Sequence, residues 1–230
     1  MDMKTELIYL KNMQELVCVA NIIDIKIEND KTAIILDQTL FYPQGGGQPF
    51  DNGVIENKNG AFKVNEVRFV DGLVYHIGIF EKGNFTTGEQ VTCLVEKEKR
   101  ELNTRLHSGG HLLDIGLKEL DRLWKPVKGY HFPQGAYVEY LAEDNTFDES
   151  LIKELENKCN EIINRNIETF IKFKEDELVN GKPARIVYYG EFGIACGGTH
   201  CKNLKDIGKM EIRKIKKDKE IIRISYSVLP

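Results

Sequence analysis

The stretch EKEKRELNTRLHSGGHLLDIGLKELDRLW, residues 96–124, marks the change of pattern that decides the fold. Its leucines recur at helical spacing, which predicts an amphipathic helix with an apolar stripe at Leu102, Leu106, Leu113, Leu117 and Leu120. His107 and His111 stand four residues apart, so a helix places both rings on one face. Gly109 and Gly110 lie between them, although a glycine costs a helix about 1 kcal/mol relative to alanine. Two weak helix formers between two aligned imidazoles indicate a chemical role.

The sequence changes character on either side of this helix. Residues 16–95 hold short alternating runs separated by turn signals such as VDG and NKNG, which predict a small β-barrel or sandwich. Residues 148–168 predict a second helix, and four later runs predict strands at 169–178, 184–191, 208–217 and 220–228. We therefore expect a β-barrel domain at residues 1–95 and an α+β domain at residues 96–230.

Composition limits the class of protein. The chain has 230 residues, with 41% hydrophobic and 30% charged residues, as in ordinary globular proteins. No apolar run is long enough to span a membrane, and the first ten residues lack the pattern of an export signal. Five cysteines form no disulfide-like framework. We expect a cytoplasmic protein without a membrane partner.

Charge is distributed unevenly along the chain. The net charge of −4 argues against indiscriminate coating of nucleic acid. The segment KMEIRKIKKDKEIIR, residues 209–223, nevertheless holds seven basic residues against three acidic ones. It is compatible with the solvated face of a hairpin and equally with a patch that contacts phosphates.

A second pair of metal-ligand residues lies far from the first. The segment ACGGTHC, residues 195–201, places Cys196 and His200 four residues apart, with Gly197 and Gly198 between them. Together with His107 and His111 they form a Cys-His₃ set, which suits zinc best. A thermolysin-like HExxH site is excluded because Ser108 follows the first histidine. Four protein ligands are typical of a closed structural site, so catalysis through zinc would require one ligand to be loose or absent.

These motifs resemble a known family. HSGGHLL, CGGTH and NLKDIG together are similar to the editing domain of alanyl-tRNA synthetase and to its free-standing relatives, the AlaX proteins. The segments WKPVKGYHFPQGAYVEY, residues 124–140, and FYPQGGGQPFDNG, residues 41–53, extend the resemblance to both halves of the chain. The resemblance implies that His107, His111, Cys196 and His200 bind Zn²⁺. It also implies that this site hydrolyses the ester between a wrong amino acid and tRNA for alanine.

The glycine-rich segment within residues 41–53 has two interpretations. It lacks the GK[ST] ending of a phosphate-binding loop, so nucleotide binding is not expected. It could simply join strands, because glycine tolerates positive φ. The resemblance implies the medium-sized AlaX class, in which an N-terminal β-barrel precedes a two-layer α+β editing domain and the loop lies close to the site. Gln44 and Gln48 are then candidates for the pocket, or purely structural residues.

Several further residues are candidates for substrate contact. Ser108 stands where synthetase editing domains commonly have threonine, and it keeps the hydroxyl. Gly109 and Gly110 would let the terminal ribose or a neighbouring strand approach the helix backbone. His131, Gln134 and Asp206 are balanced between substrate contact and a structural role.

The expected function is that of a free-standing, trans-acting deacylase, because the chain leaves no room for an aminoacylation domain. Its expected substrate is tRNA for alanine mischarged with serine, and glycine is a possible second amino acid. Two other classes stay open. A nucleic-acid-binding module with structural zinc would cleave no ester, and a small-molecule zinc hydrolase would act without the tRNA body.

Overall fold

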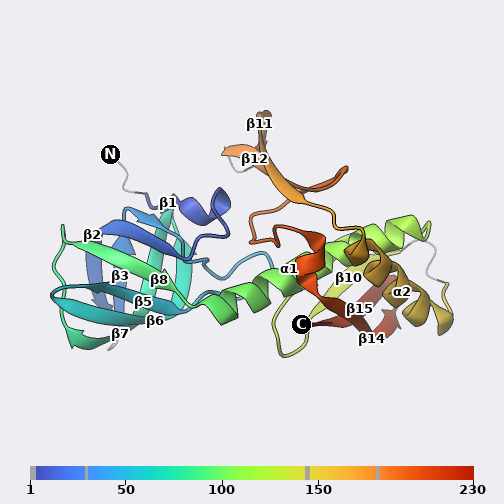
Figure 1. Ribbon diagram of the computed structural model, residues 1–230, viewed down its shortest axis with the longest axis horizontal. Coiled ribbons are helices and arrows are strands. Elements are labelled where there is room, and N and C mark those ends of the chain that lie inside the picture. The colour runs from blue at the N-terminus through green and yellow to red at the C-terminus, as the bar shows by residue number, and fades with distance from the viewer. Residues whose placement is uncertain (1–3, 29–30, 143–145, 180–181) are drawn as a thin grey trace. The chain divides into compact units, whose positions relative to one another are not determined.

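The computed structural model describes residues 4–28, 31–142, 146–179 and 182–230 (Figure 1). The chain divides into two compact units. The first, which we call the barrel unit, comprises residues 1–45 and 49–101, and the second, the α+β unit, comprises residues 46–48 and 102–230. The expected boundary between residues 95 and 96 falls in the short segment between strand β8 and helix α1.

The barrel unit contains a closed, antiparallel barrel with the strand order β2-β3-β7-β6-β5-β8. The barrel strands are β2 (Val17–Glu28), β3 (Lys31–Leu36), β5 (Gly53–Asn57), β6 (Gly60–Val70), β7 (Leu73–Gly83) and β8 (Gln90–Val95). A 3-10 turn, η1 (Ile8–Leu10), and a short parallel pair, β1 (Glu6–Leu7) with β4 (Gln38–Thr39), complete the unit. The predicted N-terminal barrel is confirmed.

Side-chain alternation explains the barrel. In β6, Phe62, Val64 and Val67 are fully buried, while residues between them face outward. The VDG signal forms the predicted tight turn between β6 and β7, where Asp71 and Gly72 both adopt positive φ, as a two-residue hairpin loop of type I′ requires.

Helix α1 (Lys97–Glu119) begins in the barrel unit and continues into the α+β unit. Its first turn is fixed within the barrel unit by Arg100, which forms a buried ion pair with Asp51 and donates to the carbonyls of Leu40 and Met13. Further along, the predicted apolar stripe is buried at Leu106, Leu113 and Leu117, whereas Leu102 is exposed.

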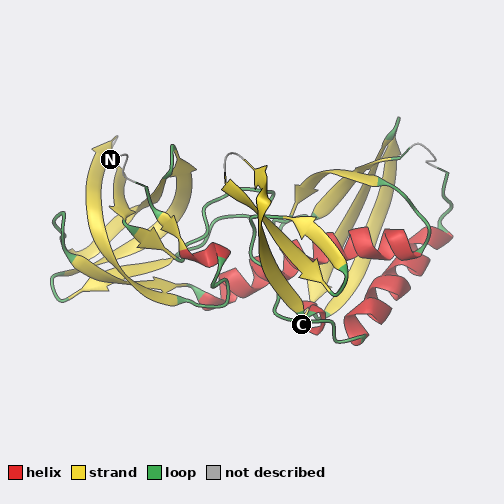
Figure 2. Cartoon of the chain, turned by 90° about the horizontal axis from the view of Figure 1, so that it is seen from above, coloured by secondary structure: helices red, strands yellow, loops and turns green. Residues whose placement is uncertain are grey.

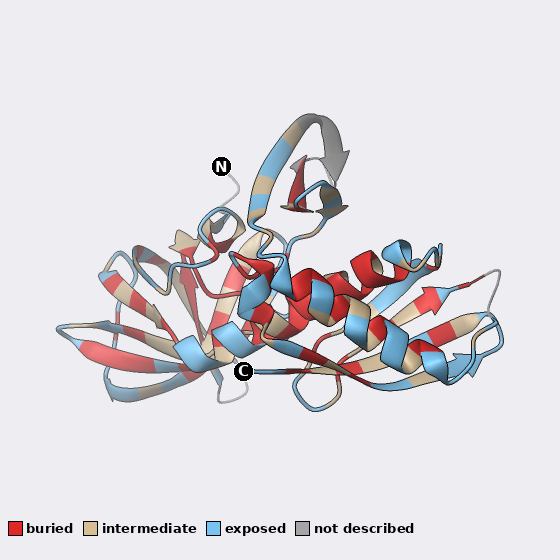
Figure 3. Ribbon diagram, turned by 45° about the vertical axis from the view of Figure 1, so that its right-hand side comes forward, coloured by how far each residue is buried: buried red, intermediate tan, exposed pale blue. Residues whose placement is uncertain are grey.

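The α+β unit is built on an antiparallel four-stranded sheet with the order β14-β15-β10-β9. Its strands are β9 (Lys125–Tyr130), β10 (Tyr137–Leu141), β14 (Lys209–Asp218) and β15 (Ile221–Leu229). Helices α1 and α2 (Ser150–Asn164) lie on one side of this sheet (Figures 2 and 3). Side chains of both helices and of the sheet share one core, which includes Leu113, Leu155, Tyr140, Ile224 and the single tryptophan, Trp124.

A smaller antiparallel sheet completes this unit. It has the order β11-β12-β13, formed by β11 (Thr169–Val179), β12 (Lys182–Tyr189) and β13 (Phe192–Ala195), and a 3-10 turn, η2 (Leu204–Ile207), follows. The mixed α+β class is thus confirmed, as are the second helix and the predicted strands of β11, β12, β14 and β15. Strands β9 and β10 were not predicted, because β9 carries Pro126 and Gly129 and shows no alternation of burial, and β10 is only five residues long, with the sequence YVEYL.

Within the described residues, no helix combines the length and apolar character needed to cross a membrane.

His76 of β7 should make the barrel unit sensitive to acid. Its ring is fully buried, with Nδ1 2.9 Å from the Ile34 carbonyl oxygen and Nε2 2.8 Å from Thr39 Oγ1. Burial lowers the pKa of His76 to about 4, although the hydrogen bond with Ile34 opposes this shift. In the unfolded chain the pKa is about 6.5, so the unfolded state binds more protons between the two values.

The stability contributed by neutral His76 should therefore be complete above about pH 6.5 and be lost as the pH falls toward 4, by up to about 3 kcal/mol. Urea unfolding followed by far-UV circular dichroism at several pH values measures this loss. His76→Gln removes the titrating group, and its free energy of unfolding should fall less steeply with acid. Identical slopes for the two proteins would contradict the prediction.

Candidate metal centre

Four potential metal ligands converge from two distant segments. His107 and His111 come from α1, and Cys196 and His200 come from the loop that follows β13. One ligand atom from each residue lies within 4.8 Å of every other. His107 Nε2 is 3.1 Å from His111 Nε2 and 3.2 Å from Cys196 Sγ. The structure thus brings together the four residues that the spacing predicts.

The loop reaches the helix because it contains glycines. A Cβ atom built on Gly198 would lie 2.3 Å from His107 Cε1, so only glycine permits this approach. The backbone N–H of Gly198 also points to Cys196 Sγ, at 3.4 Å. At Gly197, by contrast, a Cβ atom would meet nothing within 4 Å.

Two histidine rings are oriented by oxygen atoms at Nδ1. His111 Nδ1 lies 3.5 Å from the carboxylate of Asp114, which also accepts a hydrogen bond from the Tyr140 hydroxyl. His200 Nδ1 lies 2.6 Å from the Tyr189 hydroxyl. Oxygen partners of this kind fix the tautomer of a metal-binding histidine and leave Nε2 for the metal.

The donor set and its spacing fit zinc. A tetrahedral zinc site with nitrogen ligands separates neighbouring donors by about 3.3 Å, close to the observed distance between the His107 and His111 nitrogens. Thiolate and neutral imidazole are the ligands that zinc takes in such sites. The residues present therefore fit a zinc ion.

Charges around the cluster favour the ligand form of the thiol. Burial opposes ionisation of Cys196, but the neighbouring His107 ring and hydrogen bonds with His107 and His111 outweigh this effect, so the pKa of the thiol is held well below its usual value. Burial lowers the pKa of His200 to about 3, which keeps that ring neutral. Burial would lower the pKa of His111 too, but hydrogen bonds to Asp114 and Cys196 raise it to about 10. Metal binding must therefore displace a proton from His111.

A cavity of about 310 Å³ opens beside the cluster. Its walls carry polar groups from His107, His111, Asp114, Lys128, His131 and Cys196, and apolar groups from Val127, Val138 and Ile194. A cavity of this size with a few converging polar groups is typical of a ligand site.

His131 lines this cavity, and its hydrogen bonds assign the tautomer of the ring. The Tyr226 hydroxyl donates to the Leu106 carbonyl, so His131 Nδ1–H must donate to the tyrosine oxygen, 2.7 Å away. His131 Nε2 is then an acceptor. Burial and the neighbouring histidines hold the pKa of His131 well below its usual value, so the ring is neutral.

Gly109 and Gly110 make room for neighbouring side chains. A Cβ atom on Gly110 would lie 2.4 Å from His131 Cε1, and one on Gly109 would lie 3.1 Å from Tyr226. Gly110 also lines the cavity, whereas Gly109 faces the sheet. The two glycines thus admit the His131–Tyr226 pair against the helix.

Two other candidate residues are buried in supporting positions. Ser108 is fully buried, and its hydroxyl accepts a hydrogen bond of 2.9 Å from the Cys201 backbone. Gln48 is also fully buried and exchanges two hydrogen bonds with Thr199, the residue before His200. Both hold the metal-site loop, and neither lines the cavity.

The remaining candidates lie elsewhere. Gln44 is exposed in the barrel unit, and Gln134 is exposed between β9 and β10. Asp206 accepts a hydrogen bond from the Asn203 backbone in the capping box of η2. None of these three residues lines the cavity beside the metal ligands.

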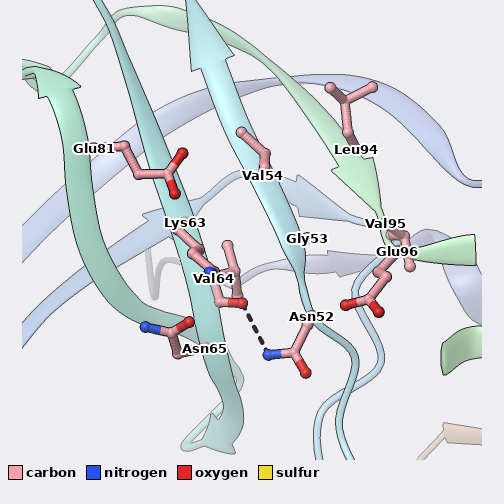
Figure 4. Close-up of a pocket in the computed structure, with 10 residues that line it drawn as sticks. All are labelled: Asn52, Gly53, Val54, Lys63, Val64, Asn65, Glu81, Leu94, Val95 and Glu96. Carbon is pink, nitrogen blue, oxygen red and sulfur yellow. Dashed lines mark hydrogen bonds between the residues drawn. The ribbon is translucent and has the colours of Figure 1, made fainter.

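A larger cavity, of about 580 Å³, lies in the barrel unit (Figure 4). Its labelled residues include Asn52, which donates to the Val64 carbonyl, and the separated charges of Lys63, Glu81 and Glu96. No group of three or more metal-ligand side chains occurs there among the described residues. The candidate metal ligands lie in the α+β unit.

Sequence reasoning missed the groups that orient the ligands. Asp114 follows His111 by three residues, a spacing that places both side chains on one face of a helix. This spacing could have identified Asp114 as a partner of His111 from the sequence. Tyr189 and Tyr226 lie on separate strands, and no local pattern connects them with histidines on a helix or loop.

The comparisons with known proteins agree with this site. Residues 3–99 match the family of class II (A) tRNA synthetases, and residues 184–225 match the second additional domain of threonyl- and alanyl-tRNA synthetases. The chain is 31% identical to the alanyl-tRNA editing protein AlaX-L of Pyrococcus horikoshii, in an alignment that covers 90% of this chain and 54% of that protein. The predicted resemblance to alanyl-tRNA editing proteins is confirmed.

Alanine–tRNA ligases are also similar to this chain. It is 34% identical to the ligase of Clostridioides difficile and 33% identical to that of a Thermoanaerobacter species, each over 80% of this chain. The chain spans about half the length of AlaX-L and 23% and 22% of these two ligases. The similarity thus concerns one portion of each relative.

Adjacent glycines in the metal loop offer a matched test of the site. Gly198→Ala should displace the His107 ring and weaken Zn²⁺ binding by about 10- to 100-fold, the range seen when groups that orient a ligand are altered. Gly197→Ala should leave the affinity unchanged because its Cβ meets open space. Competition with a chromophoric zinc chelator measures both affinities. Equal affinities of the two variants would contradict the site geometry.

Proposed function

We propose that this chain is a trans-acting aminoacyl-tRNA deacylase that hydrolyses serine, and more weakly glycine, from tRNA for alanine. The observation that carries the proposal is the Cys-His₃ cluster at the wall of a cavity of ligand size. The similarity to AlaX-L supports it. A pocket that selects alanine rejects serine only about 100-fold, so a second hydrolytic site is useful. Such an enzyme acts where tRNA is charged, which fits a cytoplasmic location.

His107, His111, Cys196 and His200 would hold the metal, and zinc fits this donor set best. When bound, zinc supplies Lewis-acid chemistry for an ester carbonyl or a water molecule. Because four protein ligands close a tetrahedral site, catalysis at the metal requires one of them to be released.

Other residues of the cavity would bind and orient the aminoacyl group. The neutral His131 ring presents Nε2 as an acceptor for a hydroxyl or an ammonium group. The Asp114 carboxylate offers a negative charge that complements the free amino group of an aminoacyl ester. Lys128 is one of the residues that line this cavity, and its ammonium group lies at the Tyr137 ring, 5.9 Å from the centroid, where a positive charge suits a phosphate of the substrate.

Two alternatives make different predictions. A nucleic-acid-binding module with structural zinc would bind RNA and hydrolyse nothing, but a purely structural site does not need the cavity beside it. A small-molecule zinc hydrolase would cleave a serine ester on a short nucleotide as fast as one on tRNA. Deacylation assays with intact tRNA and with aminoacylated minihelices, with and without a chelator, separate the three functions.

Removing the thiolate should abolish the activity. We expect about one zinc per chain in protein purified without added metal. Cys196→Ala should lose zinc and Ser-tRNA hydrolysis, with the far-UV circular dichroism of the barrel strands retained. Cys201→Ala is the matched control, because Cys201 is a buried neighbour outside the four-residue cluster, and it should keep both zinc and activity. Wild-type activity in Cys196→Ala would remove zinc from the mechanism.

The enzyme should hydrolyse Ser-tRNA faster than correctly charged Ala-tRNA. A buried polar group that pairs with the serine hydroxyl stays unpaired with alanine, at a cost of about 1–3 kcal/mol. This cost corresponds to roughly 5- to 150-fold discrimination in kcat/KM. Initial rates on the two charged tRNAs, with Gly-tRNA as a third substrate, measure the ratio. Equal rates on Ser-tRNA and Ala-tRNA would indicate a non-selective esterase.

A further inference from the structure

The four-stranded sheet of the α+β unit has one face that the helices do not cover. Burial alternates along β10 and β15, so Val138, Tyr140, Ile222 and Ile224 face the core, whereas their neighbours are at least partly exposed. Figures 2 and 3 show both helices on one side of this sheet. We call the opposite side, which carries Lys128, Tyr130, Tyr137, Arg223, Lys214 and Lys216, the open face.

Planar groups are stacked in a row on the open face. Phe132 and Tyr130 lie nearly parallel, with ring centroids 4.4 Å apart, and Tyr130 stacks on Tyr137 with centroids 5.2 Å apart. The Arg223 guanidinium continues the row, 4.3 Å from the Tyr137 centroid. The row ends on Phe132, directly after the cavity residue His131. Another planar group can extend such a stack at either end.

Positive charges run beside this row. The strand register aligns Lys128, Glu139, Arg223 and Lys216 across all four strands, and Lys214 continues the neighbouring row that contains Tyr130 and Tyr137. Glu139 is paired with Arg223, whereas Lys128, Lys214 and Lys216 are exposed. A hollow of about 210 Å³ lies between Glu139, Lys216 and Arg223. Glu211 and Asp218 are the other acids on the register positions of this face.

We infer that the open face binds the unpaired 3′ nucleotides of an RNA substrate. Stacked aromatic rings bind nucleobases through their π-faces without regard to sequence, and neighbouring lysines neutralise phosphates. This combination fits a single strand better than a duplex, because paired bases expose no faces for stacking. The inference rests on the proposed function, since β9, which carries Tyr130 of the row, also lines the cavity in which the aminoacyl end would be bound.

Binding of an unacylated oligonucleotide to the full chain tests this surface. The probe is a fluorescent single-stranded RNA of about eight nucleotides ending in CCA, and a blunt RNA duplex is the competitor. Phe132→Leu and Tyr137→Leu should each weaken binding by about 5- to 100-fold, while Tyr137→Phe should bind like the wild type. Lys214→Gln and Lys216→Gln should each lower the salt slope by about 0.7 log unit if one phosphate contact is lost.

The barrel unit supplies a matched control. Lys26 lies at the Tyr75 ring, with its ammonium 5.0 Å from the ring centroid, and donates a hydrogen bond to the Tyr75 hydroxyl; among the described residues, Tyr75 is not part of an aromatic stack. Tyr75→Leu and Lys26→Gln should leave RNA affinity unchanged. In Phe132→Trp, the fluorescence of the new indole should be quenched when RNA binds. The fluorescence of Trp124, which is buried, should stay constant.

The outcomes separate the two proposals. Loss of affinity in the leucine variants, with the duplex competing poorly, supports the open face. Unchanged affinity in these variants, equal competition by the duplex, or no binding of the single strand by the wild type would overturn it, even if Ser-tRNA is hydrolysed. Conversely, binding at the open face without any ester hydrolysis would leave this inference standing and refute the proposed function.

Discussion

The candidate site depends on the close approach of one loop to one helix. The loop after β13 contacts α1 at Gly198, where the space that a methyl group would need is occupied by the His107 ring. A similar constraint surrounds His131, whose ring occupies the space beside Gly47, Gly110 and Gly129. The two adjacent glycines of the helix cost some helical stability, and in return the His131 ring and the Tyr226 side chain pack against the helix backbone at positions where a Cβ atom would crowd them.

The polar groups that surround the ligands explain why this arrangement tolerates burial. The Asp114 carboxylate lies beside the His111 ring and accepts a hydrogen bond from the Tyr140 hydroxyl. The Tyr189 hydroxyl is the partner of the His200 ring. His107 differs, because among the described residues its buried Nδ1 has no hydrogen-bond partner. Asn103, one turn earlier on α1, is fully buried, and neither atom of its amide group has a hydrogen-bond partner in the part of the chain that the structure describes. Each buried polar group without a partner lowers the stability of the folded protein by about 1–3 kcal/mol. Several such groups close together are typical of functional sites.

Much of this architecture could be predicted from local patterns, and the limits of prediction have physical causes. Alternation of apolar residues identified the barrel, and the spacing of two histidine-containing pairs identified the four residues that converge. Strand β9 escaped because Pro126 and Gly129 interrupt any alternation, and β10 escaped because it is only five residues long, with the sequence YVEYL. The supporting role of Gln48 depends on a hydrogen bond to Thr199, 151 residues away, which no local pattern encodes. Gln134 and Asp206 have polar side chains of the kind that bind substrates, but the tertiary structure places both away from the cavity beside the metal ligands. The sequence alone does not show this placement.

Trp124 makes the tryptophan fluorescence of this protein a signal from the α+β unit alone. It is the single tryptophan of the chain, it is buried in the core of the α+β unit, and it packs near Tyr140 and Phe147. The barrel unit contains tyrosine and phenylalanine but no indole. Fluorescence excited at the red edge of the absorption band, where tryptophan alone absorbs, therefore reports the unfolding of the α+β unit. Far-UV circular dichroism reports the unfolding of both units together. A difference between the two transitions would show directly whether the two cores unfold together or in separate steps.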